Sequence, residues 1–318
     1  MKFLKHTFLG LLALSLVLGP FESLLAVTIS QLTVDNKADF VLEPGKVEIF
    51  VNEGETVNRT ISVINRINRK VKFKVEIEDF VGSDNPNTPV VLLGDQKSPY
   101  SFKDNIIPET NEFELEFGQK IELPISVQVP VGASPGGYYS SVIVSSLPPD
   151  QADPGQAGAR IISRVGVLFF IRVNGPANQE GNLDDFRISG GKNYMQKGPV
   201  TFEILFANTG NVHLVPYGIV SIKNLFGKEV GRVPVDAYFA LPKSLRYRQV
   251  TWDKEKLIGR YTAEIKMNKG YDGAEETKKI AFWVIPWTYI ASLLGVLFFL
   301  TFMWKFIGRR FEFRRKIN

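Results

Sequence analysis

Hydrophobic positions recur with a period of two along most of this chain. In residues 70–78, apolar side chains stand at every second position and each residue between them is charged. That alternation is typical of a β-strand with one face in a core and the other in water. Residues 57–63 and 121–129 show the same alternation of apolar positions. The apolar positions of the first run are Val71, Phe73, Val75 and Ile77.

Residues 165–173 differ because they are apolar on both faces for part of their length. Such a strand is either central in its sheet or covered by a neighbouring domain. A polar segment rich in turn formers follows at residues 175–182, and apolar strands resume at 200–206, 217–222 and 261–267. No helical period appears between residues 27 and 279. The predicted fold class is all-β, with two tandem Ig-like β-sandwich domains plus one C-terminal transmembrane helix.

A weak internal repeat supports two related domains. Asn65 and Asn208 each follow an apolar strand and open an Asn-x-x-Asn sequence. Asparagine suits that place because its side chain bonds nearby backbone groups. Tyr139 and Tyr261 then follow a glycine at the start of a later strand. The repeat predicts that the two asparagines occupy equivalent positions, with an insertion in the first domain around residues 82–99.

The N-terminus has the features of a secretory signal peptide. Lys2, Lys5 and His6 precede an uncharged, Leu-rich run of 15 residues that is short for a membrane span, and small residues follow up to Ala26. We expect cleavage near Ala26. The alternative is an uncleaved N-terminal anchor.

The C-terminus predicts a membrane span. Residues 280–304 carry no charge over 25 positions, which as a helix is long enough to cross a bilayer with some tilt. Tryptophans flank the run, as indole rings do in the headgroup zone, and a basic tail follows. The alternative, a core helix, would need a protein core on every face. The predicted membrane-interface residues are Trp283, Trp287, Trp304, Lys305, Arg309, Arg310, Arg314, Arg315 and Lys316.

These patterns set the domain boundaries and the topology. We predict a signal peptide at 1–26, a first sandwich at 27–174, a linker at 175–182, a second sandwich at 183–279, a transmembrane helix at 280–304 and a basic cytoplasmic tail at 305–318. By the positive-inside rule the tail stays in the cytoplasm and the N-terminal domains are extracytoplasmic. The predicted location is the cell membrane, with a single pass and membrane lipid contacted by the helix and the tail.

Charge and composition narrow the function classes. The tail holds six basic residues and one acidic residue, a net charge of +5, and the signal region adds +1. The whole chain is also +5, so residues 27–304 carry about −1 and show no excess that would favour nucleic acid. The chain has no cysteine, which excludes disulfides, thiol nucleophiles and cysteine-ligated metals.

No catalytic constellation is recognisable. His213 is the only histidine beyond the N-terminal segment, and we interpret it as structural or solvated. Glycine-rich phosphate loops, dinucleotide fingerprints and Gly-x-Ser-x-Gly are absent. We therefore predict a non-enzyme without cofactor or metal, whose function lies in its surfaces. Residues 147–159 and 82–99 are either solvated loops or tips that contact a partner.

Several short motifs resemble one family. Leu42-Glu-Pro-Gly-Lys-Val-Glu-Ile49, Ser62-Val-Ile-Asn65, Val129-Pro-Val-Gly-Ala-Ser-Pro-Gly-Gly-Tyr138 and Arg164-Val-Gly-Val167 occur in one order, with Gly54-Glu-Thr-Val57 among them. Together they resemble the bacterial WxL-interacting cell-surface proteins. That resemblance implies a domain for peptidoglycan binding, a second Ig-like domain for host proteins and a C-terminal membrane helix.

The expected function is binding by a membrane-anchored cell-envelope protein. Its expected partners are cell-wall polymer or other surface proteins. The alternatives are a membrane-tethered, chaperone-like assembly factor that caps edge strands of secreted subunits, and an accessory subunit of an envelope complex. A long, uncovered edge strand near an inter-domain cleft with a basic pocket would favour the chaperone-like alternative.

Overall fold

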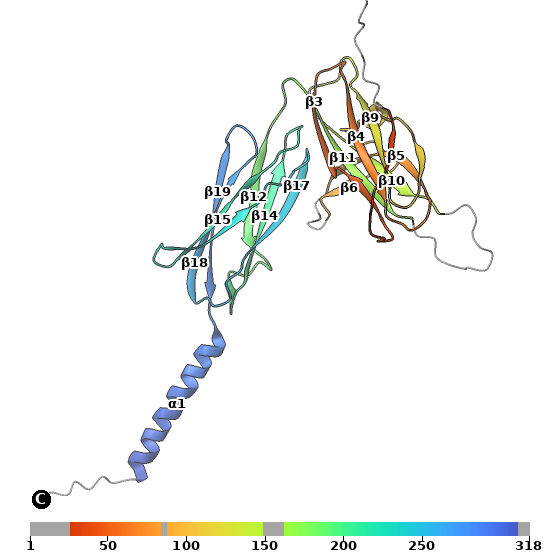
Figure 1. The fold of residues 1–318 in the computed structure, drawn as a ribbon. Helices are drawn as coiled ribbons and strands as arrows, with labels where there is room; N and C mark the ends of the chain where they lie inside the picture. Colours follow the sequence, from red (N-terminus) through yellow and green to blue (C-terminus); the bar gives the residue numbers. More distant parts are fainter. Residues whose placement is uncertain (1–25, 84, 86–87, 149–161, 311–318) are drawn as a thin grey trace, which may run out of the picture.

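The computed structural model describes residues 26–83, 85, 88–148 and 162–310. They form two β lobes followed by one long helix that leads away from the second lobe (Figure 1). Residues 1–25 of the predicted signal peptide and residues 149–159 of the segment at 147–159 lie outside the described residues, as do Arg314, Arg315 and Lys316.

The first domain is a sandwich of two sheets. One sheet has the order β1-β9-β4-β2, with β7 also on β9, and the other has the order β3-β11-β10-β5-β6, with β8 also on β5. The strands are β1 (Thr28–Gln31), β2 (Phe40–Glu43), β3 (Lys46–Val51), β4 (Thr56–Asn65), β5 (Val71–Gly82), β6 (Val90–Leu92), β7 (Ile106–Pro108), β8 (Glu112–Leu115), β9 (Gln119–Gln128), β10 (Gly136–Ser146) and β11 (Arg164–Val173), with a short 3-10 helix, η1 (Lys103–Asn105).

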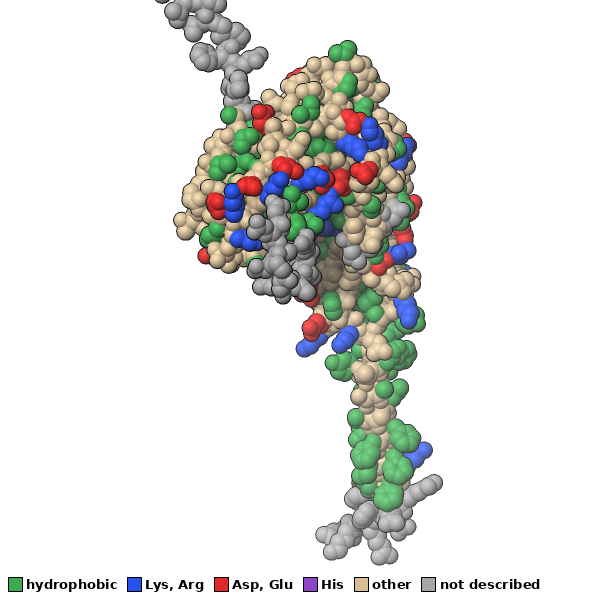
Figure 2. All heavy atoms as spheres, turned by 90° about the vertical axis from the view of Figure 1, so that its right-hand side faces the viewer, with side chains coloured by type: hydrophobic (Ala, Val, Ile, Leu, Met, Phe, Trp, Pro, Cys, Tyr) green, Lys and Arg blue, Asp and Glu red, His purple; other side chains and the backbone are tan. Residues whose placement is uncertain are grey.

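The alternating run in β5 shows why this sandwich forms. Val71, Phe73 and Val75 are buried in the core between the sheets, whereas the lysines between them face water. Lys74 pairs with Glu76 at 2.8 Å on that outer face. Figure 2 shows basic and acidic side chains interleaved over one face of the first domain. The predicted one-sided strand is confirmed.

The second domain repeats the plan. Its sheets have the orders β12-β14-β17 and β13-β19-β18-β15-β16. The strands are β12 (Gly181–Ile188), β13 (Tyr194–Met195), β14 (Val200–Asn208), β15 (Tyr217–Asn224), β16 (Glu229–Val235), β17 (Ser244–Trp252), β18 (Gly259–Asn268) and β19 (Glu275–Val284). A second buried cluster, from Leu183 to Val284, fills the space between these sheets.

The two sandwiches share their topology. In each domain an early strand, β2 or β12, pairs with the central strand of one sheet. The next strand, β3 or β13, belongs to the other sheet, where it pairs in parallel with the last strand of the domain, β11 or β19. β4 and β14 are central in equivalent sheets, and β10 and β18 lie beside the last strands. The predicted linker at 175–182 overlaps residues 174–180, which lie between the end of β11 at Val173 and the start of β12 at Gly181.

Asn65 and Asn208 make the same hydrogen bonds, which confirms that the two asparagines occupy equivalent positions. The side-chain amide of Asn65 donates to the carbonyl four residues on (Arg69, 2.9 Å) and to a remote carbonyl (Leu115, 2.9 Å). Its oxygen accepts from the N–H of Ile67, two residues on. Asn208 reproduces all three bonds with Val212, Ala240 and Gly210. Both asparagines are fully buried, so each pins a chain reversal from inside its domain.

The helix begins later than the sequence predicted. α1 spans Trp287–Arg310, whereas residues 280–284 belong to β19. Phe282 and Val284 alternate into the second core and pair across to β18, so the uncharged run is a strand before it is a helix. The segment from Trp287 to Ile307 has the length and apolar composition of a membrane span, and none of its side chains is buried. Figure 2 shows the apolar surface along it.

Removing either asparagine should destabilise its own domain. Asn208→Ala strips three hydrogen bonds and leaves buried backbone groups unsatisfied, which we expect to cost on the order of 3 kcal/mol in unfolding free energy. Asn65→Ala should cost a similar amount. Chemical denaturation of the full chain in detergent measures both.

The matched control for these variants is Asn224→Ala. Asn224 accepts bonds from Phe226 and Lys228 at an exposed hairpin tip, so its loss should cost about 1 kcal/mol or less. If Asn208→Ala costs no more than this control, the buried asparagine does not stabilise the domain as we describe.

Candidate functional site: a basic edge strand beside a fixed domain junction

The two domains meet at an aromatic junction. Phe80, Tyr139 and Phe170 of the first domain and Leu241 of the second form one buried cluster, with Phe239 packed against it. Phe170 lies on the outer face of β11, with its ring centroid 5.2 Å from that of Phe239. The both-sided apolar strand predicted at residues 165–173 is therefore one that the neighbouring domain covers.

Hydrogen bonds complete this junction. The backbone N–H of His213 donates to the Tyr139 hydroxyl at 2.6 Å, and His213 Nε2 lies 2.9 Å from Glu48 Oε1. The N–H of Gly137 donates to the Asn211 carbonyl at 3.0 Å. These bonds cross between domains and fix their relative position.

His213 has a structural role here, in line with the interpretation from sequence. Burial lowers its pKa below the usual value of 6.5, and the nearby Glu48 carboxylate offsets part of that effect. Hydrogen bonds from Lys46 and His213 hold the pKa of Glu48 below its usual value despite burial. In the described part of the chain, no group of three or more His, Cys, Asp or Glu side chains could hold a metal ion.

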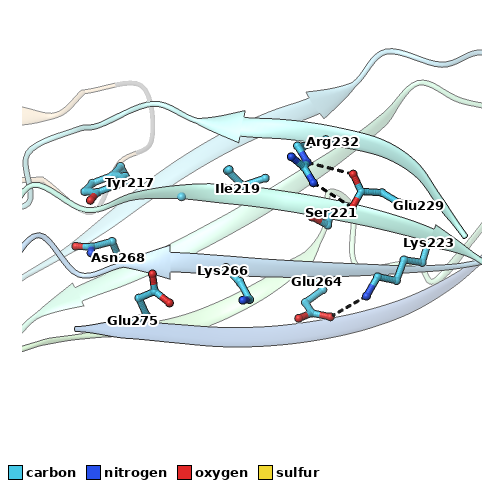
Figure 3. Close-up of a pocket in the computed structure, with 11 residues that line it drawn as sticks. Tyr217, Ile219, Ser221, Lys223, Glu229, Arg232, Glu264, Lys266, Asn268 and Glu275 are labelled. Carbon is cyan, nitrogen blue, oxygen red and sulfur yellow. Dashed lines mark hydrogen bonds and ion pairs between the residues drawn. The ribbon is translucent and has the colours of Figure 1, made fainter. Parts of the chain in front are cut away.

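A hollow on the outer face of the second domain is the first candidate surface. It lies over β15, β16 and β18 and has a volume of about 500 Å³. Figure 3 shows Arg232 turned toward Glu229 and Lys223 toward Glu264, with N–O distances of 3.1 and 3.7 Å. Since most of these charges are already paired on an open sheet face, this hollow has little capacity left for a charged ligand.

β17 offers a different surface. Among the described residues it pairs only with β14, so its other edge carries no strand. Figure 1 shows β17 on the side of the second domain that faces the first. Ser244, at the start of β17, approaches Gly82 so closely that a methyl group on Gly82 would meet its Cβ at 2.5 Å. The free edge thus begins at the domain junction.

Two arginines on this strand are charged but unpaired. Arg246 and Arg248 stand at alternate positions, so they share one face. The Arg246 guanidinium lies 5.5 Å from the centroid of the Phe239 ring, and that of Arg248 lies 5.9 Å from the Tyr238 ring. Within the described residues, neither makes a salt bridge of 4.0 Å or less.

Several polar atoms around these arginines lack partners. Nε and Nη1 of Arg246, Nε of Arg248 and the hydroxyl of Tyr238 are buried without a hydrogen bond among the described residues. Burial lowers the pKa of Arg246, and the charge of Arg248 lowers it further. Burial raises the pKa of the Tyr238 hydroxyl. Two adjacent cations with unsatisfied donors are suited to a carboxylate ligand, which accepts several N–H bonds at once.

Those predicted membrane-interface residues that the structure describes lie at or near α1. Trp283 is half-exposed on β19, Trp287 opens α1, and Trp304 follows 17 positions later, roughly 26 Å along the helix axis. Lys305, Arg309 and Arg310 belong to the last turns of α1 rather than to an irregular tail. Arg246 and Arg248 of β17 are not recognisable as functional candidates from sequence. Their only signal is an Arg-Tyr-Arg alternation, which usually marks a solvated strand face.

Similar proteins were found among solved structures. No protein-family model matches this chain, and no curated protein matches it. Among solved structures, the chain is similar to a chain of a chaperone–tip adhesin complex of CFA/I fimbriae biogenesis, with 14% identity, a TM-score of 0.38 and coverage of 78% of this chain and 99% of that one.

Two further solved structures are similar to a comparable degree. The class 5 fimbriae chaperone CfaA is 13% identical, with a TM-score of 0.37 and coverage of 78% and 100%. The Pseudomonas aeruginosa CupB2 chaperone is 12% identical, with a TM-score of 0.36 and coverage of 76% and 100%.

The junction should weaken below pH 6.5. The folded-state pKa of His213 is lowered, so the unfolded chain takes up this proton first as pH falls. The stability linked to His213 is full above pH 6.5 and is lost as pH drops through the folded-state pKa. Thermal unfolding of the full chain in detergent between pH 7.5 and 5 should therefore show a falling midpoint.

The matched variant for this prediction is His213→Gln, which keeps a side-chain amide near Glu48 but does not titrate. The decline in its midpoint over the same range should be smaller. Glu48 contributes a separate loss below its usual pKa of 4.5, outside this window. Equal slopes for the two proteins would show that His213 does not govern the pH response.

Proposed function

We propose that this chain is a membrane-anchored cell-envelope protein that binds an extended, acidic segment of another exported protein along the edge of β17. One observation carries the proposal: among the described residues β17 has no strand on its other side, and it holds Arg246 and Arg248 without a carboxylate partner, next to the domain junction. The proposal makes the protein a non-enzymatic binder of the assembly-factor kind. Membership of the WxL-interacting family and binding to cell-wall polymer stay predictions.

The free edge of β17 can bind another chain through its backbone. Backbone N–H and C=O groups on the free side of an edge strand form a template for a strand from another chain. Pairing of this kind gives affinity with little dependence on sequence, because main-chain groups are the same in every partner. The side chains beside the edge must therefore provide selectivity.

Arg246 and Arg248 make this edge selective for acidic segments. Burying a charge costs free energy unless the charge is paired. A buried guanidinium with unsatisfied donors therefore lowers the stability of the free protein. A carboxylate on an added strand would relieve this cost, because charge-assisted bonds are about twice as strong as neutral ones. An acidic segment thus gains more here than a neutral or basic one.

The helix supplies the location. α1 continues directly from the last strand of the second domain and has the properties of a membrane span. In the proposal it holds both domains on the extracytoplasmic side, with Lys305 and the following arginines in the cytoplasm.

Protease applied to intact cells tests this topology. We expect it to remove residues 27–284 and to spare α1 and the basic C-terminus, detected with a C-terminal tag. Lysed cells provide the control for access to the cytoplasmic side. Survival of the domains on intact cells, with digestion after lysis, would place them on the wrong side for this function.

Site-specific photo-crosslinking tests the β17 edge. A benzophenone amino acid replaces Leu245, which is 37% exposed on β17, or Ile219, which is 42% exposed on the face in Figure 3. We expect discrete adducts from position 245 in cells and none of comparable yield from position 219. Equal adducts from both positions would contradict a specific edge.

Charge neutralisation sharpens this test. Arg246→Gln combined with Arg248→Gln should lower the adduct yield at position 245 by at least about tenfold, because charged hydrogen bonds contribute roughly 1.5–3 kcal/mol. The double variant should remain folded or melt higher, since it removes desolvated charges. An unchanged yield would refute the role of the arginines. Retention on purified cell wall that ignores both substitutions would instead support the polymer hypothesis.

A further inference from the structure

We propose that the end of the second domain next to α1 rests in the headgroup region of the same lipid surface that α1 enters. The contact is an apolar rim of four residues, Tyr194, Leu225, Phe226 and Ile258. This inference rests on the proposed membrane anchorage and adds a second, independent contact with lipid.

Sheet register places the rim at one end of the domain. Ile258 directly precedes Gly259, which pairs with Val284, three residues before α1 begins. Tyr194 pairs with Trp283. The hairpin tip with Leu225 and Phe226 follows Asn224, which pairs with Tyr261, the neighbour of Phe282. All four residues therefore project from the end at which the helix leaves.

The most exposed large hydrophobic side chains of the second domain lie at this end. Phe226 is 89% exposed, Ile258 71%, Tyr194 63% and Leu225 61%. Among the described residues of the second domain outside α1, no other large hydrophobic side chain exceeds 60%. An apolar surface gathered at one end marks a contact rather than the scattered exposure of an ordinary surface.

The projecting turns are braced. Asn224 Oδ1 accepts hydrogen bonds from the N–H groups of Phe226 and Lys228, both at 3.0 Å. Gly227 has φ of 77°, a conformation that suits glycine and holds the hairpin tip tight. On the other turn, the Tyr261 hydroxyl donates to the Ile258 carbonyl at 3.0 Å. Both turns therefore hold an apolar side chain in water, which is unfavourable for the free domain.

Lipid is the occupant that fits this end. The rim is continuous with α1, because Ile258 lines a hollow with Pro286 and Tyr289 at the start of the helix. Lys197 and Lys256 line the same hollow, with Glu255 as the acid among them. Aromatic rings and lysines prefer the membrane interface, where an apolar body and a polar end are both satisfied. The tether keeps this surface beside the bilayer at all times.

Spin labels on single cysteines test the rim, since the chain has no native cysteine. The full chain is placed in nanodiscs of phosphatidylcholine and phosphatidylglycerol with Phe226→Cys or Ile258→Cys. Phe50→Cys is the matched control, because Phe50 is 60% exposed on β3 of the first domain, remote from α1 (Figure 1). Leu297→Cys, within α1, reports on anchorage itself.

The readout is the accessibility of each label to oxygen, which concentrates in lipid, relative to a water-soluble nickel chelate. We expect the ratio at positions 226 and 258 to exceed that at position 50 by at least threefold. If the ratios at positions 226 and 258 equal that at position 50 while position 297 gives a value typical of lipid, the rim does not contact the membrane but the membrane anchorage is supported. An aqueous value at 297 would overturn anchorage and the rim together.

Discussion

The arrangement of the whole molecule depends on β11, which is buried on both faces. Phe169 and Ile171 face the first core, while Phe170 faces the cluster shared with the second domain. Moving one domain against the other would expose Phe170, a side chain whose burial contributes about 1.5–3 kcal/mol. The contact between His213 and Glu48 would break at the same time. The free edge of β17 therefore keeps a fixed position relative to the first domain.

Much of the fold was predictable because local pattern and tertiary structure agree. The alternation in residues 70–78 specifies a one-sided strand whatever its neighbours are. Asn65 and Asn208 were recognisable as a pair because each follows an apolar strand at a chain reversal. An asparagine suits such a reversal because its side-chain amide both donates and accepts hydrogen bonds. The two-faced character of β11 predicted a strand that is either central in its sheet or covered by the neighbouring domain. Only the three-dimensional structure shows that the second domain covers it.

The failures have physical causes too. The uncharged run from residue 280 looks uniform in hydropathy, yet Phe282 and Val284 complete a sheet before the helix begins at Trp287. Apolar content cannot separate a strand that fills a core from a helix that meets lipid. Arg246 and Arg248 look like solvated strand residues in sequence. Their character comes from Tyr238 and Phe239, which the chain brings over them, and local sequence does not encode that contact.

The direction of β17 links the two proposals. Ser244 meets Gly82 of the first domain, and Trp252, at the other end, packs against Tyr261 near the start of α1. A nine-residue strand spans about 30 Å, so a segment added to β17 would run between the membrane end and the junction. With the apolar rim resting on lipid, that segment would be held close to the bilayer. The unpaired arginines lie toward the junction end, so acidic residues of the partner would meet them farthest from the membrane, where anionic headgroups compete least for a guanidinium.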